Sequence, residues 1–332
     1  MKKMKIAVLG AGSWGTALAA TLAHNGHDVR LWARRPELAG EITSTSCNSA
    51  FLPGIALPPF LCTADITRAC SEAELFVLAV PCQFLRQFLL ENQSVFPAQA
   101  ICVCASKGVE VSTLEPMSQV IRHSLSRLCP VYTVLSGPSF ALDVSRRLPT
   151  AVTLGCADER LGSLIQRVFA TDFFRVYVNT DVPGVELGGA LKNIMALAAG
   201  ISDGLGFGAS ARSALITRGL TEISRFGQAF GAKRDTFMGL SGMGDLVLTC
   251  TSDLSRNRQV GLKIGQGMHI DQIISGMNMV AEGVKTAEAV HLIARDQGID
   301  LPITRQVYEI LYKDKNPKVA LAELMHRSLK PE

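Results

Sequence analysis

Three charged residues could do chemistry because they lie in apolar or glycine-containing segments, where charged side chains are not expected. Lys192 lies in the apolar, small-residue stretch 185–200, whose apolar residues recur at three- and four-residue steps and predict a helix. Lys107 lies in a Ser-Lys-Gly segment, and Asp245 follows the glycine-rich turn 239–244, where the backbone can bend sharply. Such side chains could move a proton or bind a charged ligand. The alternatives are that Lys192 extends to reach water and that Lys107 is simply exposed.

The chain is organised around the stretch that carries Lys192. Residues before it alternate between strand and helix patterns, whereas residues after it show helix patterns only. A chain of 332 residues is too long for one ordinary core, so two domains are expected. We predict a doubly wound α/β domain with a mainly parallel sheet over residues 1–180, and an all-α domain over residues 181–332.

The first predicted strand leads into a glycine pattern with a defined physical role. The apolar run 6–9 is followed by G-A-G-S-W-G at residues 10–15 and then by a helix pattern. Gly10 allows a tight turn, Gly12 lets backbone N–H groups approach a pyrophosphate, and Gly15 lets the helix pack closely on the strand. The pyrophosphate would lie at the positive end of the helix. The pattern therefore predicts a dinucleotide-binding site.

The end of the second predicted strand, 27–32, bears on which dinucleotide is bound. Many dinucleotide-binding folds place an acidic residue there to bond the ribose 2′-hydroxyl. Here Ala33 takes that place, and Arg34 and Arg35 follow. Because the carboxylate is missing and guanidinium groups could bind a 2′-phosphate, we expect NADPH to be accepted. The alternative is that both arginines are solvated surface residues.

Polar segments also follow two later strands of the predicted sheet. Residues 106–108 follow the strand 101–105, and residues 136–141, Ser-Gly-Pro-Ser-Phe-Ala, follow the strand 132–135. Ligands bind outside the carboxyl ends of parallel strands, so both segments are candidates for a binding site. Each could instead be an ordinary exposed turn. The other predicted strands cover residues 75–81, 150–155 and 174–178.

In the second half, the segment 252–258 combines a helix cap with a basic first turn. Arg256 and Asn257 would lie where backbone N–H groups already point outward, an arrangement that suits a phosphate. Arginine at a helix start opposes the helix dipole, so a purely structural role is less favoured. A flexible turn is expected at 203–208, and further helices at 210–231, 280–294, 303–312 and 317–329.

The composition argues against several other classes of function. Net charge is +4 and the pI about 8.6, without a block of like charge, which does not indicate nucleic-acid binding but suits a small anionic substrate. No segment has the apolar length of a membrane span, and the first apolar run is too short for a signal peptide. The nine cysteines form no C-x-x-C pair, as expected of reduced thiols in a cytoplasmic protein. The six histidines are scattered, and no metal site is predicted.

Taken together, these segments resemble the bacterial NAD(P)-dependent glycerol-3-phosphate dehydrogenases over nearly the full chain. The motifs that carry the resemblance are G-A-G-S-W-G-T-A-L-A at Gly10, S-K-G at Ser106, S-G-P-S-F-A at Ser136, E-L-G-G-A-L-K-N at Glu186, G-D-L at Gly244, S-R-N-R at Ser255 and A-E-G at Ala281. The resemblance implies a Rossmann domain followed by a helical domain of the 6-phosphogluconate dehydrogenase type, commonly as a dimer. It also implies reversible reduction of dihydroxyacetone phosphate to sn-glycerol 3-phosphate with NADPH or NADH, which supplies glycerol phosphate for phospholipids.

The same resemblance implies roles for individual residues. Lys192 would be the proton donor and acceptor, with Lys107 and Asp245 in the same catalytic group. The substrate would be surrounded by Lys107, Gly137, Ser139, Lys192, Asp245, Ser255, Arg256 and Asn257. The dinucleotide would be bound by Gly10, Gly12, Ser13, Trp14, Gly15, Arg34, Lys107, Ala141, Arg256, Val280 and Glu282.

This chemistry agrees with simple physical requirements. Hydride addition to a ketone creates an alkoxide, so the site needs a cation or acid within hydrogen-bond reach of that oxygen. We expect two neighbouring lysines and an adjacent carboxylate, Asp245, to tune one ammonium towards releasing its proton. A different hydroxyacid or ketopantoate-type reductase is one alternative, distinguished by whether Arg256 binds a phosphate. A catalytically silent NAD(P)-binding sensor is the other, and the lysines at ligand edges argue against it.

Overall fold

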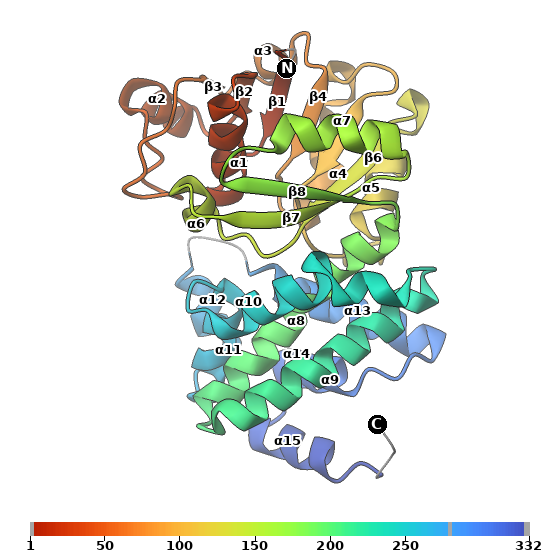
Figure 1. Ribbon diagram of the computed structural model, residues 1–332. Coiled ribbons are helices and arrows are strands. Elements are labelled where there is room, and N and C mark those ends of the chain that lie inside the picture. The colour runs from red at the N-terminus through yellow and green to blue at the C-terminus, as the bar shows by residue number, and fades with distance from the viewer. Residues whose placement is uncertain (1–2, 278–280, 329–332) are drawn as a thin grey trace. The chain divides into compact units, whose positions relative to one another are not determined.

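The computed structural model describes residues 3–277 and 281–328, and the chain divides into two compact units (Figure 1). The first comprises Met1–Lys107 and Glu115–Glu186, and the second comprises Gly108–Leu114 and Leu187–Glu332. They are called here the sheet unit and the helical unit. The segment Gly108–Leu114 belongs to the helical unit, although its place in the sequence falls within the first predicted domain.

The sheet unit is built on strands that form one sheet in the order β3-β2-β1-β4-β5-β6-β7-β8. Among the described residues, neighbouring strands are parallel except β6 and β7, which run antiparallel. The strands are β1 (Lys5–Leu9), β2 (Asp28–Trp32), β3 (Leu61–Thr63), β4 (Leu75–Leu78), β5 (Ile101–Cys104), β6 (Val131–Ser136), β7 (Thr150–Gly155) and β8 (Phe174–Asn179). The predicted doubly wound, mainly parallel sheet is confirmed, and β3 is an additional strand.

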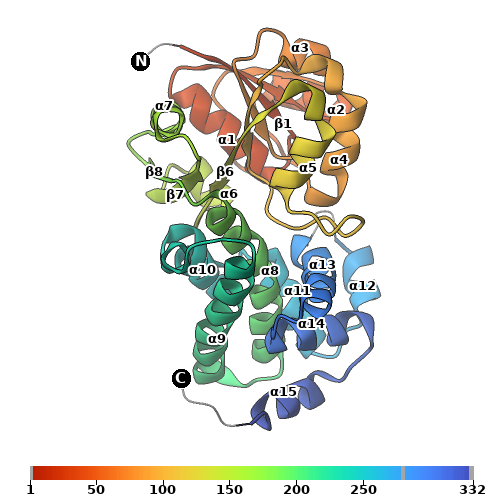
Figure 2. The ribbon, with the colours of Figure 1, turned by 90° about the vertical axis from the view of Figure 1, so that its right-hand side faces the viewer.

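Alternate residues of the central strand β1 pack on opposite faces of the sheet. Ile6 and Val8 share a core with α1 (Ser13–His24) and α7 (Glu159–Phe169), whereas Ala7 and Leu9 share one with α4 and α5. Figure 2 shows α1 and α4 on opposite sides of β1. A strand buried on both faces reads as an unbroken apolar run, which is why the sequence revealed it. The remaining helices of this unit are α2 (Pro36–Thr45), α3 (Ile66–Cys70), α4 (Cys82–Glu91), α5 (Met117–Ser124) and α6 (Ala141–Ser145).

Glu186, the last residue of the sheet unit, has a buried carboxylate that is held by hydrogen bonds. Glu186 lies in α8 (Val182–Gly204) and accepts hydrogen bonds from the backbone N–H and hydroxyl of Ser118 and from the hydroxyl of Tyr132, each at 2.7 Å. Ser118 lies in the first turn of α5, so the carboxylate also caps that helix. Burial raises the pKa of Glu186, and the hydrogen bonds oppose this shift. Helix α8 thus begins in the sheet unit and continues in the helical unit.

Helix α8 forms the centre of the helical unit. Its apolar residues from Ala190 to Ala199 are buried in one core with residues of α9, α10, α11, α13 and α14. The predicted helices are confirmed with small shifts at their ends, and α8 extends to include Asp203, which the sequence placed in a flexible turn. The other helices are α9 (Gly208–Ala229), α10 (Asp245–Thr251), α11 (Arg256–Gly265), α12 (Ile270–Ser275), α13 (Glu282–Gln297), α14 (Pro302–Tyr312) and α15 (Pro317–Met325). Within the described ranges, no helix has the length and apolar character needed to cross a membrane.

Helices α8 and α11 cross in direct backbone contact. A Cβ added at Gly200 would lie 2.0 Å from the carbonyl oxygen of Arg258, and one at Gly261 would lie 2.1 Å from the carbonyl oxygen of Leu197. No residue with a side chain fits at either position without moving the backbone. The crossing therefore fixes the first turn of α11 against α8.

The segment Gly108–Leu114 completes the core of the helical unit. Val109 is fully buried in the same cluster as the apolar residues of α8, and Val111 and Leu114 pack against that cluster. Within the segment, the hydroxyl of Thr113 donates a hydrogen bond to the carboxylate of Glu110 at 2.5 Å. A short stretch from early in the sequence is thus part of the core formed by the later helices.

Candidate active site

The glycine loop between β1 and α1 is packed tightly on its protein side. Gly10 has a φ of +116°, and a Cβ there would lie 2.7 Å from the carbonyl oxygen of Ala79. A Cβ at Gly15 would lie 1.9 Å from the carbonyl oxygen of Gly10, whereas a Cβ at Gly12 would meet no atom within 4 Å. Gly12 is the N-cap of α1. The loop is therefore open at the helix N-terminus, where backbone N–H groups can receive an anion.

Two side chains beside this loop differ in their hydrogen bonding. Asn48, which the sequence analysis did not identify, is buried and donates to the carbonyl of Ala11 at 3.1 Å and to the hydroxyl of Thr16 at 2.8 Å. It ties the loop to the first turn of α1, which Ser13 begins. The indole Nε1 of Trp14 is buried and has no hydrogen-bond partner in the described part of the chain. A buried donor of this kind is suited to a ligand at the loop.

The two arginines after β2 differ in their surroundings. Ala33 is buried, and the guanidinium of Arg35 lies 5.4 Å from the ring centroid of Phe51 in a cation–π contact. Arg34 is exposed. Of the two, Arg34 is the one whose side chain can turn to a ligand without giving up an aromatic contact.

The loops after β5 and β6 are joined through one carbonyl group. Lys107 Nζ donates to the carbonyl oxygen of Gly137 at 3.1 Å, and the hydroxyl of Ser139 donates to the same oxygen at 3.0 Å. Gly137 has a φ of +141°, and a Cβ there would lie 2.9 Å from Cα of Val152, so only glycine fits. Ala141 begins α6 directly after this loop. The structure thus brings Lys107, Gly137 and Ser139 together at the carboxyl ends of the strands.

Lys192 lies in a buried ion pair in the helical unit. Its Nζ donates to Asp245 Oδ1 at 2.6 Å and to the hydroxyl of Thr249 at 2.7 Å, and the residue is 8% exposed. Asp245 begins α10 after the π-helical turn Leu240–Gly244, and Thr249 follows one turn later on the same helix. The spacing of four residues places both acceptors on one face of α10. The ammonium is thereby held in a fixed position.

This geometry corrects one expectation. Lys192 does not extend to water, because its ammonium is held by Asp245 and Thr249. A carboxylate favours the ammonium form of a lysine, whereas burial disfavours it. That Asp245 tunes the release of the proton therefore stays a prediction.

Asn257 links three helices, one of which is the helix that carries Lys192. Its Nδ2 donates to Oδ1 of Asn193 at 2.9 Å, and its Oδ1 accepts from the backbone N–H of Gly283 at 3.0 Å. Asn193 directly follows Lys192 in α8, and Gly283 lies in the first turn of α13. The amide of Asn257 therefore connects the first turns of α11 and α13 to α8.

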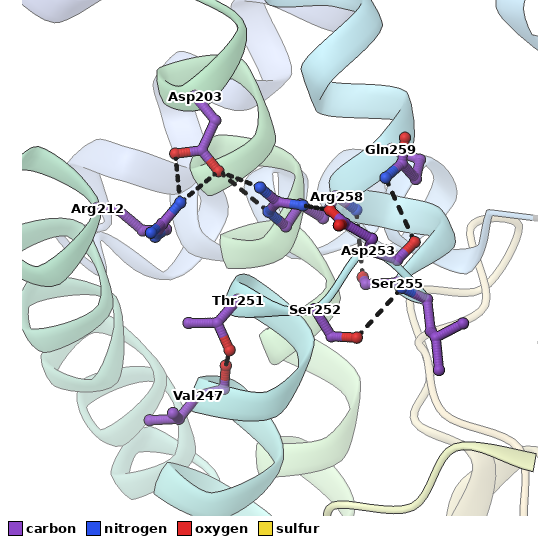
Figure 3. A network of polar contacts seen from close by, with 10 residues as sticks. Asp203, Arg212, Val247, Thr251, Ser252, Asp253, Ser255, Arg258 and Gln259 are labelled. Carbon is purple, nitrogen blue, oxygen red and sulfur yellow. Dashed lines mark hydrogen bonds and ion pairs between the residues drawn. The ribbon is translucent and has the colours of Figure 1, made fainter. Parts of the chain in front are cut away.

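The two arginines of the S-R-N-R motif have different partners. Arg258 is bonded to Asp203 and Asp253 (Figure 3), and although desolvation opposes it, these bonds raise the pKa of its guanidinium. Arg256 is exposed, and the carboxylate of Glu282 favours its charged form. Ser255 is the N-cap of α11 and accepts from the backbone N–H of Arg258 at 3.2 Å.

The predicted site residues thus fall into sets within each unit. Those of the sheet unit lie in the glycine loop, after β2 and after β5 and β6. Those of the helical unit lie on α8, at the start of α10 and at the starts of α11 and α13, where Glu282 is the first residue. Val280 lies outside the described residues. The sequence analysis missed Thr249 and Asn48 because their hydrogen-bond partners Lys192 and Thr16 lie far from them in the chain.

A glycine loop on a Rossmann sheet, followed by a helical unit with a buried lysine–aspartate pair, defines the class of nicotinamide-dependent oxidoreductases. Two family models match the chain: NAD-dependent glycerol-3-phosphate dehydrogenase N-terminus over residues 5–162, and NAD-dependent glycerol-3-phosphate dehydrogenase C-terminus over residues 181–322. The chain therefore belongs to the family of NAD(P)-dependent glycerol-3-phosphate dehydrogenases.

Individual relatives agree with this assignment. The chain is 57% identical over 330 residues to glycerol-3-phosphate dehydrogenase (NAD(P)+) of Maridesulfovibrio salexigens, covering 99% of this chain and 100% of the relative. The crystal structure of glycerol-3-phosphate dehydrogenase from Coxiella burnetii is 38% identical with a TM-score of 0.93, covering 98% of this chain and 99% of that one. A ketopantoate reductase from Ralstonia eutropha is 17% identical with a TM-score of 0.59, covering 97% of this chain and 100% of that one, and shares the fold.

Proposed function

We propose that this chain reduces dihydroxyacetone phosphate to sn-glycerol 3-phosphate, reversibly and with NADPH or NADH, and that Lys192 moves the proton. The observation that carries the proposal is the buried ammonium of Lys192, held by Asp245 and Thr249. When bound, the reduced dinucleotide supplies a hydride to the ketone carbon. The ketone oxygen takes its proton from Lys192 Nζ, and the amine recovers a proton from water. In the reverse direction, Lys192 first gives a proton to water, and its neutral amine then accepts the hydroxyl proton.

The surroundings of Lys192 support this role physically. The positive charge is present before the substrate arrives, because Asp245 keeps the ammonium charged. A charge fixed away from bulk water stabilises a developing alkoxide more strongly than a mobile one in water, since little reorganisation is needed. Thr249 limits the directions in which the ammonium can point. Asp245 is therefore proposed to hold and orient the catalytic lysine.

We assign the substrate phosphate to the first turn of α11. There Arg256 is exposed, beside the N-cap Ser255 and the amide of Asn257. Asn257 uses both amide atoms inside the protein, so its main contribution is to the position of the turn. Lys107, Gly137 and Ser139 are also proposed to contact the substrate.

The dinucleotide is assigned to the glycine loop and the residues around it. The open position at Gly12 and the buried, unbonded indole N–H of Trp14 fit a bound pyrophosphate group. Arg34 is proposed to contact the 2′-phosphate of NADPH. Ser13, Ala141, Arg256, Val280 and Glu282 are proposed to line the rest of the nucleotide site. Residues 1–180 would then bind the nucleotide, and residues 181–332 would supply most of the substrate site.

In the cell, we propose that the product supplies glycerol phosphate for phospholipid synthesis. We also propose that the protein is cytoplasmic and acts as a homodimer. The dispersed cysteines, with no C-x-x-C pair, support a reducing compartment. The dimer rests on the family resemblance.

The substrate assignment is tested by comparing two ketones in an NADPH absorbance assay. Arg256→Ala removes one or two charge-assisted hydrogen bonds of about 1.5–3 kcal/mol each, so kcat/KM for dihydroxyacetone phosphate should fall at least about tenfold. Unphosphorylated dihydroxyacetone makes no such bond, so its kcat/KM should hardly change. Equal losses on both ketones would mean that Arg256 serves the nucleotide or the fold. Faster turnover of ketopantoate than of dihydroxyacetone phosphate would contradict the substrate assignment itself.

A further inference from the structure

A buried ion pair joins the end of α8 to the first turn of α11 (Figure 3). Asp203 Oδ2 accepts from Arg258 Nε at 3.0 Å and from Nη2 at 2.7 Å, and both side chains are only 9% exposed. Asp203 also accepts two hydrogen bonds from Nη1 of Arg212 on α9, at 2.9 and 3.0 Å. One carboxylate thus holds guanidinium groups from two different helices.

The same arginine also fixes the turn that precedes α11. Arg258 Nη1 bonds Asp253 Oδ1 at 2.5 Å, and the side chain of Asp253 is 87% exposed. The backbone N–H of Arg258 donates to the hydroxyl of Ser255, and Gln259 donates to the carbonyl of Asp253 at 3.3 Å. The turn 252–255 is therefore tied to the first turn of α11, with Arg256 between these contacts.

The contact between α8 and α11 is continued by backbone and amide groups. At Gly200 the two helices are too close for a side chain, because a Cβ would lie 2.0 Å from the carbonyl oxygen of Arg258. Towards the start of α8, Asn193 accepts a hydrogen bond from Asn257. Asn257 and Arg258, the two residues that follow Arg256 in the motif, are thus each bonded to the helix that carries Lys192.

We infer that Asp203 is a positioning residue for substrate recognition: through Arg258, it sets where the first turn of α11 presents Arg256 to the substrate phosphate. This rests on the proposed role of Arg256. Arg258 is suited to the task because a planar guanidinium can bond two carboxylates at once in fixed directions. If Asp203 is removed, Arg258 keeps only the exposed Asp253 as an acidic partner among these residues. The turn is then held less firmly.

The test compares Asp203→Asn with the native protein at saturating NADPH, on phosphorylated and unphosphorylated dihydroxyacetone. We expect KM for dihydroxyacetone phosphate to rise at least about fivefold, as partial loss of a charge-assisted contact would give, while kcat changes by less than about threefold. For unphosphorylated dihydroxyacetone, kcat/KM should stay within about twofold. A parallel loss on both ketones would assign Asp203 to folding alone.

A double-mutant cycle separates this inference from the proposed function. If Arg256→Ala already distinguishes the two ketones, adding Asp203→Asn should cost less than about a further twofold on dihydroxyacetone phosphate. Fully additive losses would show that Asp203 does not act through Arg256, although the phosphate site at Arg256 would stand. If Arg256→Ala alone does not distinguish the ketones, the proposed phosphate site fails and the inference fails with it.

Two further variants guard against a general loss of structure. Arg212→Gln removes the other partner of the same carboxylate, so it should lower Tm without changing KM for dihydroxyacetone phosphate. An equal rise in KM for this variant would point to local packing and overturn the inference. If Asp203→Asn does not fold, Arg258→Lys is the substitute, because a lysine keeps the charge but cannot reproduce the bonds to both carboxylates. It should show the same rise in KM, and an unchanged KM would contradict the inference.

Discussion

In the sheet unit the candidate site is made largely of backbone, whereas in the helical unit it is made of side chains. The glycine loop is open at Gly12, and Gly137 supplies the carbonyl oxygen that Lys107 and Ser139 share. In the helical unit, Lys192 is held by Asp245 and Thr249 on a neighbouring helix. Backbone geometry can bind a group that many proteins share, such as a pyrophosphate, whatever the neighbouring side chains are. Side chains fixed by ion pairs can recognise and act on one particular substrate.

The largest effect on kcat is expected at Lys192, the proposed catalytic residue of the helical unit. Lys192→Met should lower kcat by roughly a hundredfold to ten-thousandfold, because the acid for the alkoxide is lost. Lys192 is not among the residues assigned to the nucleotide, so NADPH affinity measured by fluorescence titration should remain within about threefold of normal. A kcat within a few fold of the native value would remove Lys192 from the mechanism and undo the contrast between the units.

In the sheet unit, Arg34 is the side chain that we expect to contribute most to distinguishing NADPH from NADH. Arg34→Ala should weaken NADPH binding more than NADH binding, by about 1–3 kcal/mol for a charge-assisted contact. The measurement is the Kd of each nucleotide by calorimetry. The matched control is Arg35→Ala, because Arg35 contacts Phe51 and should affect the two nucleotides alike. Equal losses of NADPH and NADH affinity with Arg34→Ala would exclude a 2′-phosphate contact.

The backbone character of the sheet-unit site can be tested with two alanines. Gly12→Ala meets no protein atom, so Tm should hardly change while NADPH affinity falls on the order of tenfold, because a methyl group blocks the approach of the pyrophosphate. Gly15→Ala would place a Cβ 1.9 Å from a carbonyl oxygen, so it should lower Tm markedly. If Gly12→Ala binds NADPH normally, the pyrophosphate does not lie at this turn.

The smallest effect is expected at the second partner of Lys192. Thr249→Val has nearly the same shape but cannot accept from Nζ, and one hydrogen bond is worth about 0.5–1.5 kcal/mol. We therefore expect kcat to fall by about two- to tenfold in the steady-state assay. Asp245→Asn should cost more, because it removes the charge that stabilises the ammonium. A larger loss for Thr249→Val than for Asp245→Asn would reverse the roles assigned to the two residues.

Sequence patterns predicted the parts of the fold that local physics determines. Strands buried on both faces, such as Leu75–Leu78, appear as unbroken apolar runs, and the strand–glycine–helix order around Gly10 marks the loop. The strand Leu61–Thr63 was missed because three residues are too few to show a period. The antiparallel pairing of β6 and β7 was not foreseen, because an apolar run carries no information about strand direction.

In the candidate site, the residue types were foreseeable but their partners were not. Lys192 and Asp245 could both be identified, yet nothing in the sequence shows that they bond across a separation of 53 positions. Asp203 was placed in a flexible turn because glycines follow it, whereas it lies in the last turn of α8 and forms an ion pair with Arg258. Contacts between residues far apart in the chain have no local pattern, so only the folded structure reveals them.

The segment Gly108–Leu114 also has a consequence for the order in which the protein can fold. Val109 is buried among apolar residues of helices that are synthesised much later, so the helical unit cannot complete its core until both parts of the chain are available. Residues 181–332 expressed alone would lack that side chain and leave a gap in the core. The complete core of the helical unit therefore depends on a stretch that emerges from the ribosome far earlier than its helices.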